Sequence, residues 1–187
     1  MKNLTTQEFC EKYPAGIMEG HFIMKFETMR DCYAALLRGE EGNRHSAEWA
    51  IQIIGQTGVL APKTLVKFAC RCARQAWGRM TDERSRRAVE VAEAWADGLA
   101  TDSERETAVV TAWAAAVDAA QHATSFCCDV AWAAAYVAWA AVHAADHAYD
   151  AVYAASYAAA YAVADVRVAA RAEQLEFLRE LGNPFEE

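Results

Sequence analysis

Residues 130–148 read VAWAAAYVAWAAVHAADHA, and this composition sets the expected fold class. The stretch belongs to a longer segment, residues 101–181, that contains neither proline nor glycine. Alanine makes up nearly half of residues 108–172. Alanine is the strongest helix former because its side chain loses no rotamers on ordering. The segment therefore predicts helix throughout, with one or two interruptions.

Large side chains recur in this alanine background at steps of three or four residues, which matches the period of a helix. They are Trp132, Tyr136, Trp139, His143, His147, Asp150, Tyr153, Tyr157 and Tyr161. The other faces carry mainly methyl groups. Small side chains let helices approach toward the short end of the usual interaxial range of about 8–10 Å. We predict tight helix pairs with aromatic side chains as wedges between them.

A single helix over residues 125–181 would be long for a small domain, roughly 85 Å at about 1.5 Å per residue. The best candidate for a break is at residues 123–125, because Thr124 and Ser125 can cap a new helix. Residues 146–150 and Asp165 are weaker candidates. We expect either a projecting helix or a division at one of these places.

Shorter helices are predicted upstream from their end signals. Capping-box patterns begin at Thr5 and Thr101, and Pro62 suits a first helical turn. The predicted helices start at Thr5, Thr28, Ser46, Pro62, Asp82 and Thr101, with residues 40–44 as a surface loop. The chain is predicted to end in a helix closed by Gly182, followed by Pro184 and Phe185, a hydrophobe able to fold back.

No segment alternates with period two for long enough to predict a strand. The expected fold class is all-α, a multi-helix bundle with closely packed, alanine-rich C-terminal helices. We expect one domain over residues 1–187. It divides into an N-terminal helical region (residues 1–44), a region of short helices (45–100) and the long alanine-rich helices (101–187).

The composition excludes several classes of protein. The formal net charge is −8 and the pI is about 5.2, which argues against a general nucleic-acid binder. No uncharged apolar run reaches the ~18 residues of a membrane span, and no secretory signal opens the chain. The six cysteines form no C-x-x-C pair, so we expect buried, reduced thiols. A soluble cytosolic protein without a cofactor is the prediction.

Four polar residues share one helical face at i, i+3, i+4 and i+7: His143, Asp146, His147 and Asp150. Two histidines four residues apart on a helix can hold one metal ion, as in zinc metalloproteases. Asp118 and His122 form a similar pair that an antiparallel helix can present opposite. The competing interpretation, which we favour, is a set of polar side chains that hydrogen-bond to one another across a tight alanine interface. A glutamate general base beside the histidines is missing.

A basic stripe, Lys63, Lys67, Arg71 and Arg74, lies along one predicted helix of this acidic chain. Such a stripe can bind an acidic partner surface or phosphates. A solvated face paired with Glu90 or Glu93 of the next helix is the simpler interpretation.

Aromatic residues provide a second candidate for partner binding. Tyr153, Tyr157 and Tyr161 form a ladder at i, i+4 and i+8. Tyrosine is enriched in interface hot spots, although core packing with the hydroxyl at the rim is more common. The tryptophans at 49, 77 and 95 lie on apolar faces and are predicted to be core.

Two parts of the chain together resemble a known family. The first is residues 65–98, with LVKFAC at 65–70, ARQAW at 73–77, TDERS at 81–85 and AVEVAE at 88–93; the second is HAADHA at 143–148. They resemble the helical immunity-protein family of bacterial polymorphic-toxin systems and its alanine-rich phage relatives, over about residues 59–164. The resemblance implies a non-enzymatic protein that binds and neutralises another protein. In a phage this role would be that of an anti-CRISPR or other anti-defence protein.

The leading hypothesis is therefore a binding protein that inhibits another macromolecule by covering its surface. The target would be a protein or ribonucleoprotein, either a host defence complex or a toxin. Two alternatives stay open: a metal-dependent hydrolase that uses the His/Asp cluster, and a structural homodimer built on the long helices.

Overall fold

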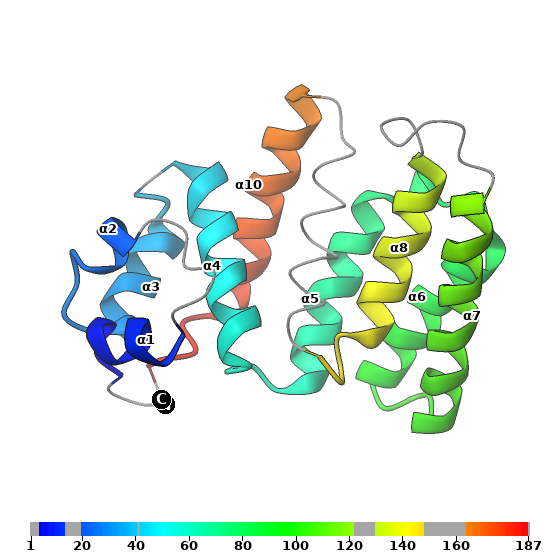
Figure 1. Cartoon of the computed structure of the whole chain (residues 1–187), viewed down its shortest axis with the longest axis horizontal. Coiled ribbons are helices and arrows are strands. Elements are labelled where there is room, and N and C mark those ends of the chain that lie inside the picture. Colours follow the sequence, from blue (N-terminus) through cyan, green and yellow to red (C-terminus); the bar gives the residue numbers. More distant parts are fainter. Residues whose placement is uncertain (1–3, 14–19, 41, 122–129, 148–163, 187) are drawn as a thin grey trace.

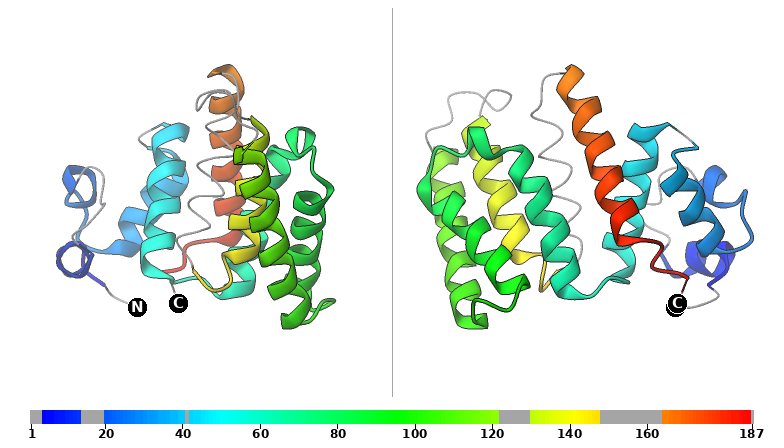
Figure 2. Two further views of the ribbon diagram at one scale, coloured as in Figure 1. Left: turned by 45° about the vertical axis from the view of Figure 1, so that its right-hand side comes forward. Right: turned by 180° about the vertical axis from the view of Figure 1, so that it is seen from behind.

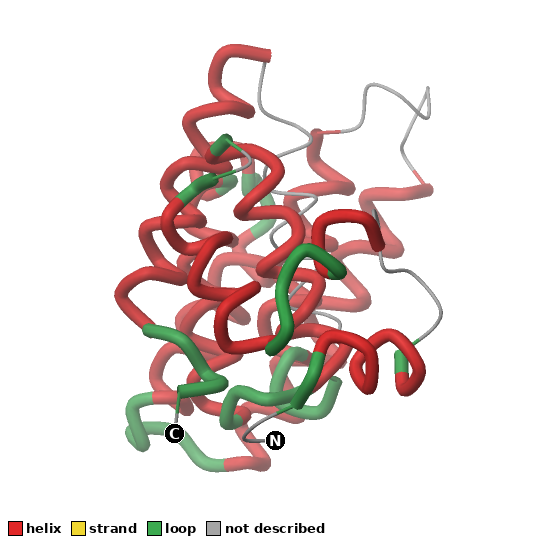
Figure 3. Tube along the Cα trace, turned by 90° about the vertical axis from the view of Figure 1, so that its left-hand side faces the viewer, coloured by secondary structure: helices red, strands yellow, loops and turns green. Residues whose placement is uncertain are grey.

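The computed structural model describes residues 4–13, 20–40, 42–121, 130–147 and 164–186. These residues form helices and loops without a strand, which confirms the all-α prediction (Figure 3). The α-helices are α1 (Thr6–Lys12), α2 (Gly20–Ile23), α3 (Met29–Arg38), α4 (Asn43–Thr57), α5 (Pro62–Gln75), α6 (Glu83–Ala96), α7 (Asp102–Gln121), α8 (Val130–His143) and α10 (Ala164–Leu181), and residues Trp77–Arg79 form one 3₁₀ turn. None of the described helices is long and apolar enough to cross a membrane.

The predicted helix starts are confirmed where the signal lies within one turn. Thr101 donates its backbone N–H to the Glu104 carboxylate at 2.8 Å, and the Glu104 N–H donates to the Thr101 hydroxyl at 3.2 Å. This reciprocal pair satisfies two N–H groups at the start of α7. Thr5 opens α1 with the same capping box. In this way local side chains supply the hydrogen bonds that the first turn of each helix lacks.

The predicted cap at Ser46 is wrong, because α4 begins at Asn43. Gly42 precedes the helix with φ +79°, a left-handed conformation that glycine adopts readily. The Ser46 N–H already donates to the Gly42 carbonyl at 3.0 Å, so Ser46 lies inside the first turns. Its side chain is fully buried. The polar loop before α4 is correspondingly shorter than the sequence indicated.

The helices form two neighbouring groups. Helices α5, α6, α7 and α8 pack against one another, and α7 lies at the far end of the molecule, in contact with α6 and α8 (Figure 1). Helices α1 to α4 lie at the other end, and α10 packs on α4, α3 and α5 between the two groups (Figures 1 and 2). One continuous apolar core joins them.

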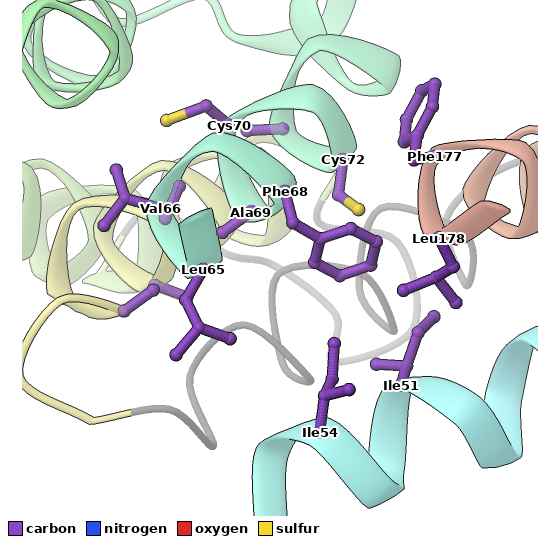
Figure 4. Packing of buried hydrophobic residues seen from close by; sticks show 14 of the residues in the cluster. Ile51, Ile54, Leu65, Val66, Phe68, Ala69, Cys70, Cys72, Phe177 and Leu178 are labelled. Atoms are coloured by element: carbon purple, nitrogen blue, oxygen red, sulfur yellow. The ribbon is translucent and has the colours of Figure 1, made fainter. Parts of the chain in front are cut away.

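Large apolar side chains fill the junction between the two groups. Phe68 of α5 lies among Ile51 and Ile54 of α4 and Leu178 of α10 (Figure 4). Phe68 and Ile51 are each 1% exposed. Beyond α10 the chain turns back, and the buried Phe185 ring lies 5.7 Å from the Tyr33 ring of α3. The predicted fold-back of the C-terminal hydrophobe is confirmed, and it fastens α10 to the N-terminal group.

The alanine-rich segment is divided rather than continuous. Helix α8 ends at His143, and the backbone N–H groups of Asp146 and His147 both donate to the His143 carbonyl, at 3.0 and 3.2 Å. A break near Asp146, one of the weaker candidates, is therefore present. The candidate break at residues 123–125 lies outside the described residues.

Candidate protein-interaction surface

The outer side of α7 and α8 carries a row of aromatic rings. Trp113 of α7 packs on Trp139 of α8, with ring centroids 5.2 Å apart. Trp139 also contacts Tyr136 at 5.2 Å and stacks on His143 at 5.0 Å. Val110 lies one turn before Trp113, and these two side chains are 70% and 49% exposed. We call these five residues, Val110, Trp113, Tyr136, Trp139 and His143, the α7–α8 aromatic face.

This face exists because alanine occupies the inside of the bundle. The residues of α7 that are at most 8% exposed and apolar are Ala108, Ala112, Ala115 and Ala116. They follow the helix period, so the opposite side of α7 must point to solvent. A seam of methyl groups leaves no room for an indole. The rings of Trp113, Tyr136 and Trp139 therefore lie at the edge of the helix pair, where part of each ring stays exposed.

An ion pair fixes the two helices relative to each other at one end of this face. The Arg105 guanidinium of α7 donates to both carboxylate oxygens of Asp146, at 2.7 and 3.0 Å. The Arg105 side chain is only 7% exposed, and its guanidinium carbon lies 5.1 Å from the Trp95 ring. Two parallel hydrogen bonds are a strong and directional arrangement. The pair holds the turn after α8 against the first turns of α7.

The Arg105–Asp146 ion pair also bears on the predicted metal site. His143 and His147 do come together, with ring centroids 4.6 Å apart. Asp146 instead bonds to Arg105, which occupies both of its oxygens. Asp150 lies outside the described residues. Within the described ranges, no group of three or more His, Cys, Asp or Glu side chains is placed to hold a metal ion.

Of the second acid–histidine pair, the structure describes only Asp118. Asp118 of α7 forms an ion pair with Arg84 of α6 at 2.8 Å. His122 lies outside the described residues. The known role of Asp118 is therefore to connect α6 to α7.

The basic stripe forms ion pairs with neighbouring helices. Lys67 lies 2.7 Å from the Asp97 carboxylate, and Arg74 donates to Glu93 at 2.8 Å, the partner helix that the sequence indicated. The remaining two contacts are made by Arg71, which pairs with Glu180 of α10, and by Lys63, whose ammonium lies 5.6 Å from the Trp95 ring. The stripe thus joins α5 to α6 and α10.

Two of these arginines also stack on aromatic rings. The guanidinium carbons of Arg71 and Arg74 lie 3.8 Å from the ring centroids of Phe177 and Trp77. Each guanidinium is held by a carboxylate as well as by a ring. The pKa of Glu180 is lowered, chiefly because Arg71 donates hydrogen bonds to it. A ring with a nearby carboxylate is therefore an arginine-binding combination that this chain uses twice.

The predicted tyrosine ladder, Tyr153, Tyr157 and Tyr161, lies outside the described residues. The three tryptophans predicted to be core, Trp49, Trp77 and Trp95, are half-buried and pack against the core with one edge exposed. The Trp95 indole N–H donates to Asp102 at 2.7 Å. The Trp49 indole N–H, in contrast, is buried and has no hydrogen-bond partner among the described residues.

A groove lies between α6 and α7. It has a volume of about 410 Å³ and is lined by both arginine and glutamate side chains and by hydroxyls. Thr107 and Thr111 lie in it, but their hydroxyls donate to backbone carbonyls of the preceding turn at 2.9 and 2.8 Å. Glu104 is engaged in the cap of α7. No histidine or cysteine lines this groove, so its hydroxyls have no imidazole base and no thiolate beside them.

The described cysteines are free thiols, and most of them are buried. Burial raises the pKa of the Cys32 thiol from 9.0 to about 12, with a smaller contribution from the neighbouring Cys10. Burial also raises the pKa of Cys70 and Cys72. A thiol must ionise to act as a nucleophile or a metal ligand. These three side chains are therefore packing residues, as the sequence predicted.

Comparisons with models of protein families, with curated proteins and with solved structures found no significant match. The likeness to immunity proteins therefore rests on the motifs quoted from the sequence. The aromatic face includes two residues that the sequence reading did not single out, Val110 and Trp113. No clear signal in the sequence marks them, because alanines occur on every side of α7 and those at 114 and 120 are exposed.

Proposed function

We propose that this chain is a non-enzymatic binding protein that inhibits another macromolecule by covering part of its surface. The observation that carries the proposal is the α7–α8 aromatic face, where Trp113 is 49% exposed and contacts a second tryptophan. Tryptophan and tyrosine dominate the energetics of protein interfaces, and a row of them on a rigid helix pair is suited to binding. The absence of an activated nucleophile from the described grooves and thiols supports binding over catalysis.

The target class in this proposal is a protein or a ribonucleoprotein. The resemblance to immunity proteins favours a toxin, and the likeness to phage relatives favours a host defence complex such as a CRISPR effector. In this proposal, the chain meets its target in the cytoplasm. The four described cysteines are free thiols, which is usual in a reducing compartment. Direct binding of nucleic acid is disfavoured by the formal net charge of −8.

Inhibition is the property to test. The tagged chain is used as bait in a lysate of its host cell, captured proteins are identified by mass spectrometry, and the activity of each purified candidate is titrated with the chain. We expect one captured candidate to lose activity, with the loss complete at a fixed molar ratio. Inhibition by covering a surface must saturate in this way, whereas an enzyme would act at catalytic amounts. If no captured protein loses activity, the proposal is wrong.

The two alternatives have separate readouts. A metal-dependent hydrolase would carry about one equivalent of metal after purification without a His-tag, and its activity would be lost on His147→Ala. The bond between Asp146 and Arg105 weighs against this alternative, because it removes one proposed ligand. A structural homodimer would show twice the monomer mass by light scattering in the absence of any partner. The three readouts do not depend on one another.

A further inference from the structure

The exposed charges of α7 are all of one sign. The charged residues of this helix are Asp102, Glu104, Arg105, Glu106 and Asp118, and only Arg105 is basic. Arg105 is buried and paired with Asp146, so it contributes no positive charge to the surface. The described side chains of α8 include no lysine or arginine. The outer side of this helix pair is therefore both aromatic and acidic.

Glu106 is the acidic residue closest to the face by helix phase. It lies four residues before Val110 and seven before Trp113, on the same side of α7. The other exposed acids of α7 already have partners: Asp102 accepts from Trp95, Glu104 caps the helix and Asp118 binds Arg84. Among the described residues, Glu106 makes no hydrogen bond or ion pair. It is the carboxylate that a partner can bind without breaking a contact.

The face repeats a chemistry that the chain uses internally. Arg71 stacks on Phe177 beside Glu180, and Arg74 stacks on Trp77 beside Glu93. Trp113 supplies an exposed ring, and Glu106, two helical turns earlier on the same side of α7, supplies a carboxylate. In the described part of the chain, no lysine or arginine side chain lies over the Trp113 ring. The position is therefore open to an arginine or lysine from another molecule.

The spacing of the apolar residues indicates the shape of the partner segment. Val110, Trp113 and Val117 lie at i, i+3 and i+7 of α7, and Tyr136 and Trp139 lie at i and i+3 of the adjacent α8. A ridge of side chains at these spacings is what a third helix packs against. A second copy of this chain is a poor occupant, because each copy has a formal net charge of −8 and would bring an acidic α7 of its own.

We infer that the α7–α8 aromatic face docks a cationic amphipathic helix of the partner protein, with arginine or lysine side chains over Trp113 and beside Glu106. This inference deepens the proposed function and rests on it, because it names the chemistry of the surface that is covered. The apolar side of the partner helix would lie on Val110 and Trp139. One of its basic side chains would lie over the Trp113 ring, and another would lie beside the Glu106 carboxylate.

The probe is a display library of random 16-residue peptides, selected on the immobilised chain and counter-selected on Trp113→Ala. We expect the enriched peptides to carry net positive charge, with apolar residues three and four apart. The affinity of the best peptide, measured by isothermal titration calorimetry, should fall on the order of tenfold in Trp113→Ala, as for a hot-spot residue. Glu106→Lys should weaken it severalfold, and added salt should do the same.

Leu99→Ala is the matched control, since Leu99 is 82% exposed and lies in the turn between α6 and α7, away from the face. Binding by this variant should be unchanged. Glu106→Lys alters an exposed side chain, so it tests the inference even if Trp113→Ala fails to fold. Enriched peptides that are neutral or acidic, or that bind Trp113→Ala and Glu106→Lys as well as the original chain, would overturn the inference.

The inference and the proposed function can fail separately. If the Trp113→Ala and Glu106→Lys variants inhibit a partner as well as the original chain does, the proposed function is supported and the inferred binding surface is wrong. If cationic helices bind this face but the chain inhibits no captured protein, the inferred binding surface is supported and the proposed inhibitory function is wrong.

Discussion

The two ends of the molecule bury different kinds of side chain. Around α3 and α4 the core consists of large groups, with Tyr33, Leu36 and Ile51 at most 1% exposed. Around α7 and α8 it consists largely of alanine, with Ala112 and Ala141 fully buried. Large groups stabilise a fold through the apolar area that each removes from water, whereas alanines contribute little area each and depend on close helix approach. The aromatic rings are inside at the first end and at the surface of the second.

This contrast suggests a division of labour. The N-terminal group and α10 stabilise the chain in the ordinary way, by filling space with large residues. The alanine bundle leaves the rings of Trp113 and Trp139 at its edge, held in place by the Arg105–Asp146 pair. In the proposed complex, rings that these contacts already hold in place would lose less entropy on binding.

The contrast predicts, first, that truncating a large core residue is the most damaging change. Phe68 is 1% exposed and lies where α4, α5 and α10 meet (Figure 4). Phe68→Ala should lower the free energy of unfolding by about 3–5 kcal/mol, because it removes apolar contacts and leaves a cavity. The measurement is urea unfolding followed by circular dichroism. Leu99→Ala, at the most exposed large hydrophobe, should stay within about 0.5 kcal/mol.

If Phe68→Ala and Leu99→Ala lower the free energy of unfolding by similar amounts, Phe68 does not occupy a packed junction. The two groups of helices would then be less dependent on one another than the continuous core indicates.

The alanine bundle should respond to the opposite change, an increase in size. Ala112 is fully buried on the inner side of α7. Ala112→Leu should cost about 1–3 kcal/mol, because a larger side chain forces the helices apart. Ala114→Leu is the matched control on the same helix, where the residue is exposed and leucine is nearly as good a helix former. Equal stability of the two variants in urea would show that α7 is not closely packed.

Local signals predicted most of the fold, and non-local packing accounts for what was missed. The caps at Thr5 and Thr101 need only residues three apart, so the sequence located them. The start of α4 was misplaced because Ser46 is a good cap by type, whereas the backbone enters the helix at Gly42 and the Ser46 N–H already bonds to the Gly42 carbonyl. The pairing of Arg71 with Glu180 crosses 109 positions and leaves no periodic signal.

The candidate surface was harder to predict for a related reason. In an alanine-rich helix every side has similar hydrophobicity, so periodicity does not reveal which side is buried. Tryptophan is a residue type expected in a core, and only the packing of α7 on α6 and α8 shows that the Trp113 side chain faces outward. His143 and Asp146 were predicted to belong to one polar cluster, but Asp146 binds an arginine that lies on another helix.

Alkaline pH should distinguish the two ends by a smaller effect. In the described part of the chain the buried thiols are Cys32 in α3 and Cys70 and Cys72 in α5, and none lies in α6, α7 or the described part of α8. The pKa of Cys32 is raised from 9.0 to about 12 by burial, and then by the nearby Cys10. The folded thiol therefore keeps its proton at a pH where the unfolded thiol loses it. Stability from this group is complete below pH 9 and is lost as the pH rises from 9 toward 12.

The expected loss is up to about 1.4 kcal/mol per pH unit for one such thiol, since one proton is released on unfolding. Urea unfolding at several pH values between 8 and 10.5 measures the slope. Cys32→Ala should reduce the slope of the unfolding free energy against pH by an amount that corresponds to about one proton. This holds whatever its effect on absolute stability, because only the titrating group has been removed. An identical slope in the variant would mean that Cys32 ionises as easily in the folded chain as in the unfolded one. The large-residue core around α3 would then admit water, and the contrast with the alanine bundle would disappear.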